Sequence, residues 1–336
     1  AVSFCCLRTH ISSNFRNCVG FHTDGAACNI TTFCMLILVC DFRSKFLPDC
    51  YLGRSMSLCE DWWGRPRLSR VVPKDHMLKL HNTWFDGGHK YVRWSPDTSG
   101  LLKHIKTVLS DQLKPNLSRR CSHIKGHGGV KLSVRYSQRL CNHFGYVARF
   151  DVKSYYSSMD HQIILDLLRQ YKVTPPVISI VSEYLSHPDH RNTGKGMVAG
   201  GAISPLIGAL YLTPLDKLME DLRVTTGIRY QRYMDDYVIF APTRHKLRKA
   251  IKKMYAVLDD LKVKVHPKKR FIGTTRRRFD FLGYWLEPHK PLTPSQVSLT
   301  RLIDRSRQLH ERTASITRLR QYVHRWLQWH RSGLRG

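Results

Sequence analysis

The segment from Tyr230 to Phe240 reads YQRYMDDYVIF. Its two adjacent aspartates, Asp235 and Asp236, separate two segments with the aromatic and β-branched composition of strands. The pattern therefore predicts a hairpin that carries the two aspartates at its tip. Adjacent carboxylates repel each other, and burial increases that cost. The negative charge at this tip must be compensated by a positive charge from elsewhere.

The whole chain is strongly basic. It has 336 residues, enough for one large domain or for two to three lobes, and its 55 Lys and Arg against 25 Asp and Glu give a formal net charge of +30. This balance predicts a polyanionic partner, with nucleic acid as the first candidate and a membrane surface as the alternative. The basic residues are spread along the chain and do not gather on one amphipathic segment, which favours nucleic acid. We expect no membrane partner.

Residues 1–55 differ from the rest of the chain. They carry little of the excess charge and hold most of the ten cysteines, and their apolar run at 33–40 is too short to span a bilayer. We expect them to be an atypical leader outside the native chain, which would start near Met56. No CxxC pair occurs, so zinc binding is not favoured. The chain after Cys59, with only Cys121 and Cys141, fits a reducing compartment, and we expect a cytoplasmic protein.

A second aspartate follows a strand-like segment upstream. Residues 146–152 read YVARFDV, and a period of two places Val147, Arg149 and Asp151 on one face. Asp160 then caps a predicted helix with an apolar stripe. A Gly-rich loop over 194–201 precedes Ser204-Pro205, where another helix should begin and include Leu218.

The C-terminal half shows three further patterns. Residues 244–261 predict an amphipathic helix, residues 263–288 predict short strands around turns, and the segment from about Ser295 is helical in pattern.

The two acidic positions can form one site if their strands are neighbours. Alternation predicts that Asp235 faces Asp151, whereas Asp236 points to the other face or into the turn. Two facing carboxylates become favourable when divalent cations lie between them. Mg²⁺ prefers oxygen ligands, and a pair of ions about 3.5–4 Å apart activates one oxygen and stabilises another. The sequence thus predicts a two-metal site.

Five motifs in order resemble a reverse transcriptase of the bacterial group II intron-like branch, which includes retron and defence-associated enzymes. They are FDVKSYYSSMDH (150–161), GMVAGGAISPL (196–206), YMDD (233–236), HPKK (266–269) and FLGY (281–284). The resemblance implies an α+β right-hand polymerase, with an antiparallel palm sheet backed by helices. It implies fingers over 56–145, a palm over 146–290 with some fingers elements around 172–200, and a helical thumb over 291–336.

The resemblance also implies roles for the acidic residues and for one lysine. Asp151 and Asp235 would bind both Mg²⁺ ions, with Mn²⁺ as the other suitable ion. Asp236 would complete the acidic set, and the carbonyl of Val152 would assist. Lys269 resembles the lysine near the leaving pyrophosphate, a candidate general acid. The alternative for Lys269 is a plain basic turn.

Nucleotide and primer contacts are implied in the same way. Tyr156 resembles the steric gate against a ribose 2′-OH, with Tyr155 as the alternative one residue away. Gly200 and Gly201 would let the backbone approach the incoming nucleotide. The family's usual Pro-Gln before these glycines is replaced by Val198-Ala199, so Ala199 cannot donate the glutamine's hydrogen bond. The implied primer grip comprises Phe281, Leu282, Gly283 and Tyr284.

The implied activity is RNA-directed DNA synthesis. The partners would be an RNA template, a DNA or RNA primer and dNTPs, with a cognate non-coding RNA as a further partner. The residues after the primer grip suffice for a helical thumb, and we expect no nuclease or integrase domain there. A non-catalytic RNA-binding or splicing factor and an RNA polymerase or terminal nucleotidyl transferase are the alternatives. Intact Asp151, Asp235 and Asp236 favour an enzyme. Lys125, Lys131 and Arg135 are triphosphate candidates by composition alone.

Overall fold

The computed structural model describes residues 78–86, 89–187 and 193–332. The predicted leader over residues 1–55 lies outside this part of the chain. The described residues fall into two compact units, one formed by Arg301–Leu327 and the other by the remainder.

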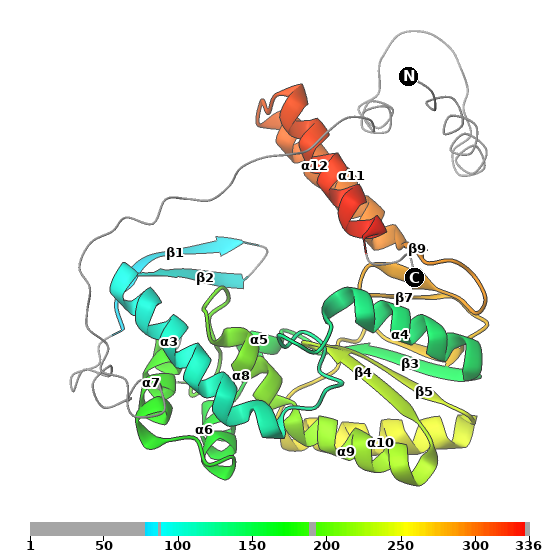
Figure 1. Cartoon of the computed structure of the whole chain (residues 1–336), viewed down its shortest axis with the longest axis horizontal. Coiled ribbons are helices and arrows are strands. Elements are labelled where there is room, and N and C mark those ends of the chain that lie inside the picture. The colour runs from blue at the N-terminus through cyan, green and yellow to red at the C-terminus, as the bar shows by residue number, and fades with distance from the viewer. Residues whose placement is uncertain (1–77, 87–88, 188–192, 333–336) are drawn as a thin grey trace, which may run out of the picture. The chain divides into compact units, whose positions relative to one another are not determined.

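A four-stranded antiparallel sheet lies at the centre of the larger unit, in the order β4-β5-β3-β6 (Figure 1). Its strands are β3 (Tyr146–Asp151), β4 (Arg229–Tyr233), β5 (Asp236–Ala241) and β6 (Phe271–Thr274). The predicted hairpin over residues 230–240 is therefore confirmed, and its two strands lie next to the strand that ends at Asp151. The α+β class and the antiparallel sheet are also confirmed.

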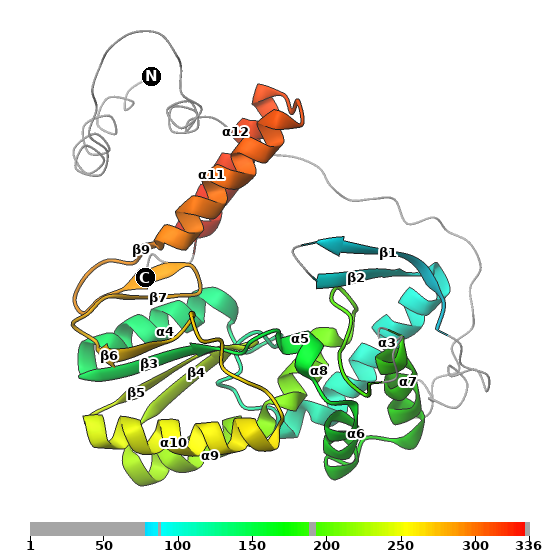
Figure 2. The same ribbon diagram turned by 180° about the vertical axis from the view of Figure 1, so that it is seen from behind.

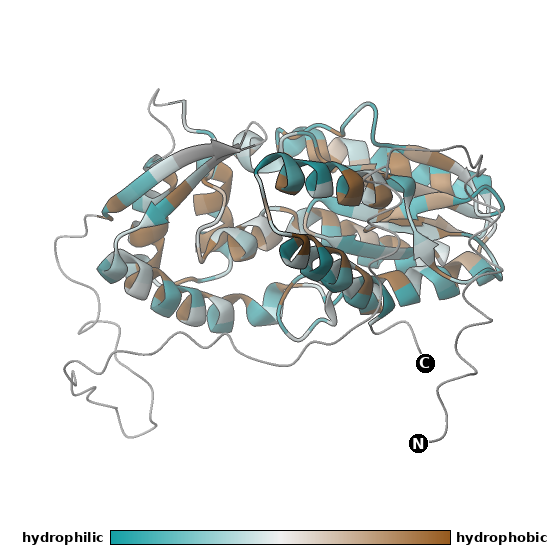
Figure 3. Ribbon diagram, turned by 90° about the horizontal axis from the view of Figure 1, so that it is seen from above, coloured by the Kyte–Doolittle hydropathy of each residue, from teal (hydrophilic) through white to brown (hydrophobic). Residues whose placement is uncertain are grey.

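Strand alternation sends side chains into a different core on each face of the sheet. Ala148 and Phe150 of β3 enter the larger core, whereas Val147 enters a second core. On the first face lie α9 (Thr213–Thr226) and α10 (Arg244–Asp260), side by side in both views (Figures 1 and 2). On the second face lie α4 (Gly129–His143) and the small sheet of β7 (Phe279–Phe281), β8 (Tyr284–Leu286) and β9 (Thr293–Pro294). The helices show hydrophilic and hydrophobic bands, as amphipathic packing requires (Figure 3).

The remaining helices of the larger unit pack beside a β-hairpin. These elements are β1 (Leu80–Asp86), β2 (His89–Trp94), α3 (Pro96–Leu113), the 3-10 turn η1 (Lys114–Asn116), α5 (Tyr155–Ser158), α6 (His161–Gln170), α7 (Pro175–Ser186) and α8 (Ser204–Tyr211). The predicted cap is confirmed, because the Asp160 carboxylate accepts hydrogen bonds from the backbone N–H groups of Gln162 and Ile163. Trp94 is buried and packs on Tyr184 at 5.3 Å between ring centroids.

One predicted helix is two helices. The helix that begins at Ser204 ends at Tyr211, and Leu218 belongs to α9, which starts at Thr213. Pro214 stands in the first turn of α9, where its missing N–H is tolerated; within one continuous helix it would remove a bond and clash with the preceding turn.

The C-terminal segment is helical, as predicted. It forms α11 (Gln296–Glu311) and α12 (Ile316–Arg331), which lie side by side in both views (Figures 1 and 2). Leu319 and Val323 of α12 are buried. Within the described ranges, no helix combines the length and the apolar character that crossing a bilayer requires.

The FLGY motif forms the β7–β8 hairpin. Leu282 (φ 49°) and Gly283 (φ 84°) make its two-residue turn, whereas Phe281 and Tyr284 are fully buried in the second core. Leu282 and Gly283 are only half-buried. The motif therefore combines two core anchors with an accessible tip.

We predict that Phe281→Ala lowers the free energy of unfolding by about 3–5 kcal/mol, because it leaves a cavity in a closed core. Leu282→Ala, one residue away on the half-buried tip, should cost under about 1.5 kcal/mol. Urea titrations of both variants test this. Equal losses would contradict the placement of Phe281 in the core.

Candidate active site

The β4–β5 hairpin turns through two residues. Tyr233 pairs with Asp236, so that Met234 and Asp235 alone form the turn. Met234 has a left-handed backbone, with φ 56°. The register between β3 and β5 places Asp236 directly opposite Asp151.

This register corrects the prediction of which aspartate lies opposite Asp151. Asp235 was expected to face Asp151 alone, yet Asp236 is the cross-strand partner and Asp235 lies in the turn. The reason is that the turn removes Met234 and Asp235 from the strand alternation, which restarts at Asp236. Directly opposed residues of antiparallel strands share one face of the sheet, so Asp151 and Asp236 are neighbours on that face.

The three carboxylates form one electrostatic site. Burial, followed by the charges of Asp151 and Asp235, raises the pKa of Asp236 to about 7. Burial followed by the charge of Asp151 also raises the pKa of Asp235. The site therefore holds more negative charge than its surroundings balance.

Lys269 stands next to this site. Its Nζ lies 3.2 Å from Oδ2 of Asp151, and its side chain is about half exposed. The HPKK turn is held there by the backbone N–H of His266, which donates to the carbonyl of Asp151 at 2.8 Å. The contact between Lys269 and Asp151 is consistent with the prediction that Lys269 lies at this site.

The donor set fits divalent cations. Among the described residues, no three His, Cys, Asp or Glu side chains already stand close enough together to hold an ion. Lys269 pairs with Asp151 in this set. The raised pKa values show the unbalanced charge that a cation of two positive charges would relieve.

The backbone carbonyl of Val152 points away from the neighbouring strand segment at residues 264–266. The ladder bonds beside it run from His266 N–H to the carbonyl of Asp151 and from Lys153 N–H to that of Lys264, both 2.8 Å. In antiparallel pairing this leaves the Val152 carbonyl on the opposite edge of the strand.

The structure separates the two candidate gate tyrosines. Tyr155 is buried, and its hydroxyl donates to the carbonyl of Gly208 at 2.6 Å. Tyr156 stacks on Tyr155 but is only half-buried. Its pKa is raised by burial and then by the charge of Asp235, which places it near the catalytic turn. Tyr155 is thus a core residue, and Tyr156 is available to a ligand.

The Gly-rich loop docks beside Tyr156. The backbone N–H of Met197 donates to the carbonyl of Tyr156 at 2.8 Å, and Ala199 bridges to Tyr91 of β2. Gly200 has φ 85°, and a Cβ on Gly201 would stand 1.7 Å from the hydroxyl of Tyr184. Gly201 is therefore required by close packing, while Gly200 supplies a backbone conformation that side chains disfavour.

Only two of the four residues in the predicted primer grip are accessible. Because Phe281 and Tyr284 are fully buried, only Leu282 and Gly283 can contact a ligand directly. Phe281 and Tyr284 hold the tip in place.

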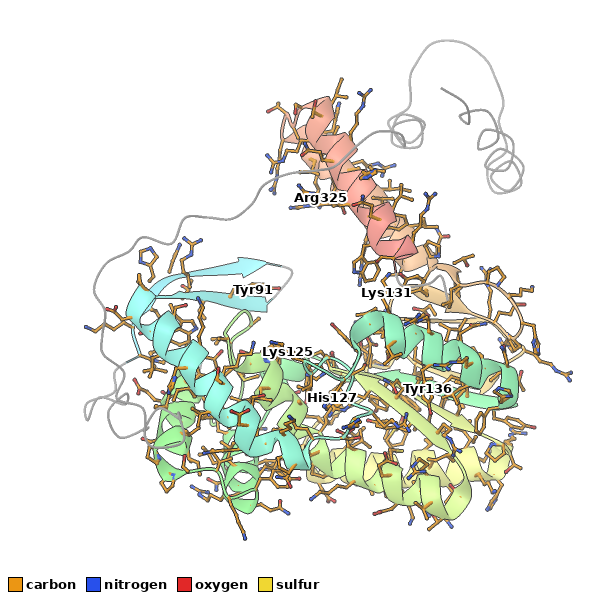
Figure 4. All side chains as sticks on the ribbon, in the orientation of Figure 1. Tyr91, Lys125, His127, Lys131, Tyr136 and Arg325 are labelled. Carbon is orange, nitrogen blue, oxygen red and sulfur yellow. The ribbon has the colours of Figure 1, made fainter. Side chains whose placement is uncertain are left out.

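Lys131, a triphosphate candidate by composition, is engaged elsewhere. Its Nζ lies 3.9 Å from the centre of the Trp329 ring and donates to the Tyr284 hydroxyl. Burial lowers its pKa to about 8. Lys125, on the loop before α4, is exposed instead (Figure 4).

Sequence reasoning missed a buried ion pair beneath the turn. Arg232 is fully buried, and its guanidinium pairs with Asp216 of α9 through two hydrogen bonds. Nη1 of Arg232 also donates to the carbonyl of Met234 at 2.9 Å. Arg232 stands in a strand with Tyr230 and Tyr233, and this was a usable signal because a buried guanidinium requires an acidic partner.

Comparison with known proteins gives a consistent picture. The family model described as reverse transcriptase (RNA-dependent DNA polymerase) matches residues 96–286. The chain is 25% identical over 175 residues to a retrovirus-related Pol polyprotein from type-1 retrotransposable element R2 of Nasonia vitripennis, covering 47% of this chain and 17% of that protein.

Telomerase structures are among the similar solved structures. Telomerase from Candida albicans with a TWJ fragment of telomeric RNA aligns with a TM-score of 0.45 and 12% identity, over 59% of this chain and 38% of that one. Apo telomerase from Candida Tropicalis aligns at 0.48 and 11%, over 70% and 50%. The chain thus spans half or less of each of these relatives.

We predict that Asp216→Asn lowers the free energy of unfolding by about 3–5 kcal/mol, because it leaves Arg232 buried without its counter-charge. Asp166→Asn breaks the exposed pair with Arg169 on α6 and should cost at most about 1 kcal/mol. Urea unfolding of the two variants makes the comparison. A small loss for Asp216→Asn would show that Arg232 is hydrated or otherwise paired.

Proposed function

The chain belongs to the reverse transcriptase (RNA-dependent DNA polymerase) family, and from this premise we propose that it extends a primer 3′-OH with dNTPs on an RNA template. One observation carries the proposal: the β3 end and the β4–β5 turn bring Asp151, Asp235 and Asp236 into one electrostatic site. The right-hand polymerase fold assigns the central sheet and its helices to the palm. Fingers over 56–145, palm over 146–290 and thumb over 291–336 are the boundaries we propose.

The acidic residues would hold two divalent cations, which we propose to be Mg²⁺, with Mn²⁺ as a substitute. Asp151, Asp235 and Asp236 would supply carboxylate oxygens, and Val152 its carbonyl. When bound, such ions activate the attacking hydroxyl and stabilise the leaving oxygen. Lys269, beside Asp151, would hold a proton on Nζ for the leaving pyrophosphate.

Nucleotide selection would depend on Tyr156 and on the loop beside it. The half-buried Tyr156 ring lies near Asp235, where it would meet a ribose 2′-OH. The backbone of Ala199, Gly200 and Gly201 would lie along the incoming nucleotide. Leu282 and Gly283 would hold the primer end for in-line attack.

The finer affiliation is also a proposal. The order of the five motifs supports a bacterial group II intron-like enzyme of the retron or defence-associated kind, which would copy a cognate non-coding RNA. The two described cysteines, Cys121 and Cys141, are free and buried, which supports a reducing, cytoplasmic setting. The acidic set disfavours a non-catalytic RNA-binding or splicing factor, and the open Tyr156 ring disfavours an RNA polymerase.

We predict that the double change Asp235→Ala, Asp236→Ala abolishes primer extension on an RNA template with dNTPs and Mg²⁺, because it removes two of the three carboxylates. Asp221→Ala removes an exposed acid of α9 and should leave the rate unchanged. Radiolabelled primer extension makes the measurement. Synthesis at the wild-type rate by the double variant would refute the metal site and, with it, the proposed chemistry.

We predict that Tyr156→Ala raises rNTP incorporation relative to dNTP by about 10- to 100-fold, because it removes the ring that would exclude the 2′-OH. Tyr155→Phe keeps the neighbouring ring and loses only the hydroxyl bond to Gly208, so it should keep the wild-type preference. The ratio of kcat/KM for one rNTP and its dNTP, on the same template, decides between them. A shift with Tyr155→Phe alone would reassign the gate.

A further inference from the structure

The Met234 peptide unit needs support from its surroundings. A left-handed backbone is uncommon for a residue other than glycine and persists only where neighbours hold it. Both backbone polar groups of Met234 are held by side chains. Arg232 Nη1 donates to its carbonyl at 2.9 Å, and its N–H donates to Nδ1 of His123 at 3.0 Å.

These bonds define the protonation of the His123 ring. Because Nδ1 accepts from Met234, it carries no proton, and the proton of a neutral ring is then on Nε2. Nε2 lies 3.0 Å from the carbonyl of Pro205, to which it donates. The Cys121 thiol, 3.4 Å from Nδ1, can only add a second donor there. Burial lowers the pKa of His123 to about 4, so the ring is neutral near pH 7.

His123 is itself fixed against the catalytic strand. The backbone N–H and the hydroxyl of Ser122 both donate to the carbonyl of Arg232, at 2.8 and 2.9 Å. Cys121 forms a parallel bridge with Arg232, and the His123 ring meets Tyr233 edge-on at 5.8 Å. The segment before α4 thus runs along β4 and presents His123 to the turn.

The other contact of His123 leads to the nucleotide side of the site. Pro205 lies in the first turn of α8, directly after the Gly-rich loop. The neighbouring Ser204 hydroxyl donates to the carbonyl of Val198 and pairs with the Tyr184 hydroxyl that also packs on Gly201. One imidazole therefore connects the catalytic turn with the base of the loop proposed to bind the nucleotide.

We propose that His123, in its Nε2–H form, is a positioning residue that fixes the Met234–Asp235 turn against the base of the Gly-rich loop. This inference rests on the proposed polymerase function. Its consequence is that Asp235 and the loop keep a set separation before substrate arrives, so that the turn does not have to be ordered during each catalytic cycle.

Two conservative substitutions separate the two bonds. In His123→Asn the amide oxygen can take the place of Nδ1 and accept from Met234, while the contact with Pro205 is lost. In His123→Gln the amide nitrogen can take the place of Nε2 and donate to Pro205, while Met234 loses its acceptor. We expect His123→Asn to keep kcat within about threefold, and His123→Gln to lower kcat by about 10- to 100-fold with little change in KM for dNTP, since small misplacements near reacting groups have effects of this size.

The matched control is His127→Gln. His127 lies in the same loop (Figure 4), and its Nδ1 contacts the carbonyl of Cys121, without a hydrogen bond to the turn. It should keep wild-type kcat. Thermal denaturation of all three variants checks that they fold. Equal kcat for the asparagine and glutamine variants, or wild-type kcat for both, would overturn the proposal.

A second measurement does not need activity. In protein labelled with ¹⁵N-methionine and ¹⁵N-histidine, Met234→Leu assigns the Met234 amide. We expect that amide signal to shift in His123→Gln and not in His127→Gln, and the wild-type His123 ring to show an unprotonated Nδ1. A protonated Nδ1 would refute the inference even if the glutamine variant fails to fold. Absence of polymerisation by the wild type, with the expected spectra, would refute the proposed function alone.

Discussion

The buried ion pair between Arg232 and Asp216 is the interaction on which the site depends. A guanidinium removed from water needs its counter-charge and all its hydrogen bonds. The free-energy cost of an unpaired buried charge is far larger than the gain from any single hydrogen bond. Arg232 meets this demand with the carboxylate of Asp216 and the carbonyls of Ala209 and Met234. Those partners belong to α9, α8 and the catalytic turn, so one side chain fixes two helices against the hairpin.

This pair also explains how the site tolerates its negative charge. Burial raises the pKa of Asp235. The fixed positive charge of Arg232 under the turn opposes part of that increase. Arg149, held by Asp280 at 2.7 Å, acts on Asp236 in the same direction. Arg232 is bound to Asp216 and Arg149 to Asp280. Both guanidinium groups therefore oppose part of the repulsion while each keeps its own acidic partner.

The sequence predicted the parts of this site that follow from local periodicity. Asp151 at the end of a strand, the hairpin around the paired aspartates and the cap at Asp160 all follow from alternation or capping within a few residues. The face of Asp236 could not be predicted, because it depends on the left-handed backbone of Met234. Residue type disfavours that conformation, and the hydrogen bonds with Arg232 and His123 stabilise it. Likewise, the FLGY letters do not reveal that Phe281 and Tyr284 are core residues, since burial is set by the packing of α4 and β5 against them.

Val198 and Ala199 stand where the family usually has Pro-Gln, and each makes contacts of its own. Val198 is buried, and its carbonyl accepts the hydroxyl of Ser204, so this position serves the packing of the loop. Ala199 pairs through its backbone with Tyr91 of β2, a residue of a different element. Under the proposed function, Ala199 would offer a nucleotide only its backbone groups, because its methyl side chain has no hydrogen-bond donor. Discrimination between nucleotides would then come from side chains elsewhere in the site, and the half-buried Tyr156 near Asp235 is the candidate.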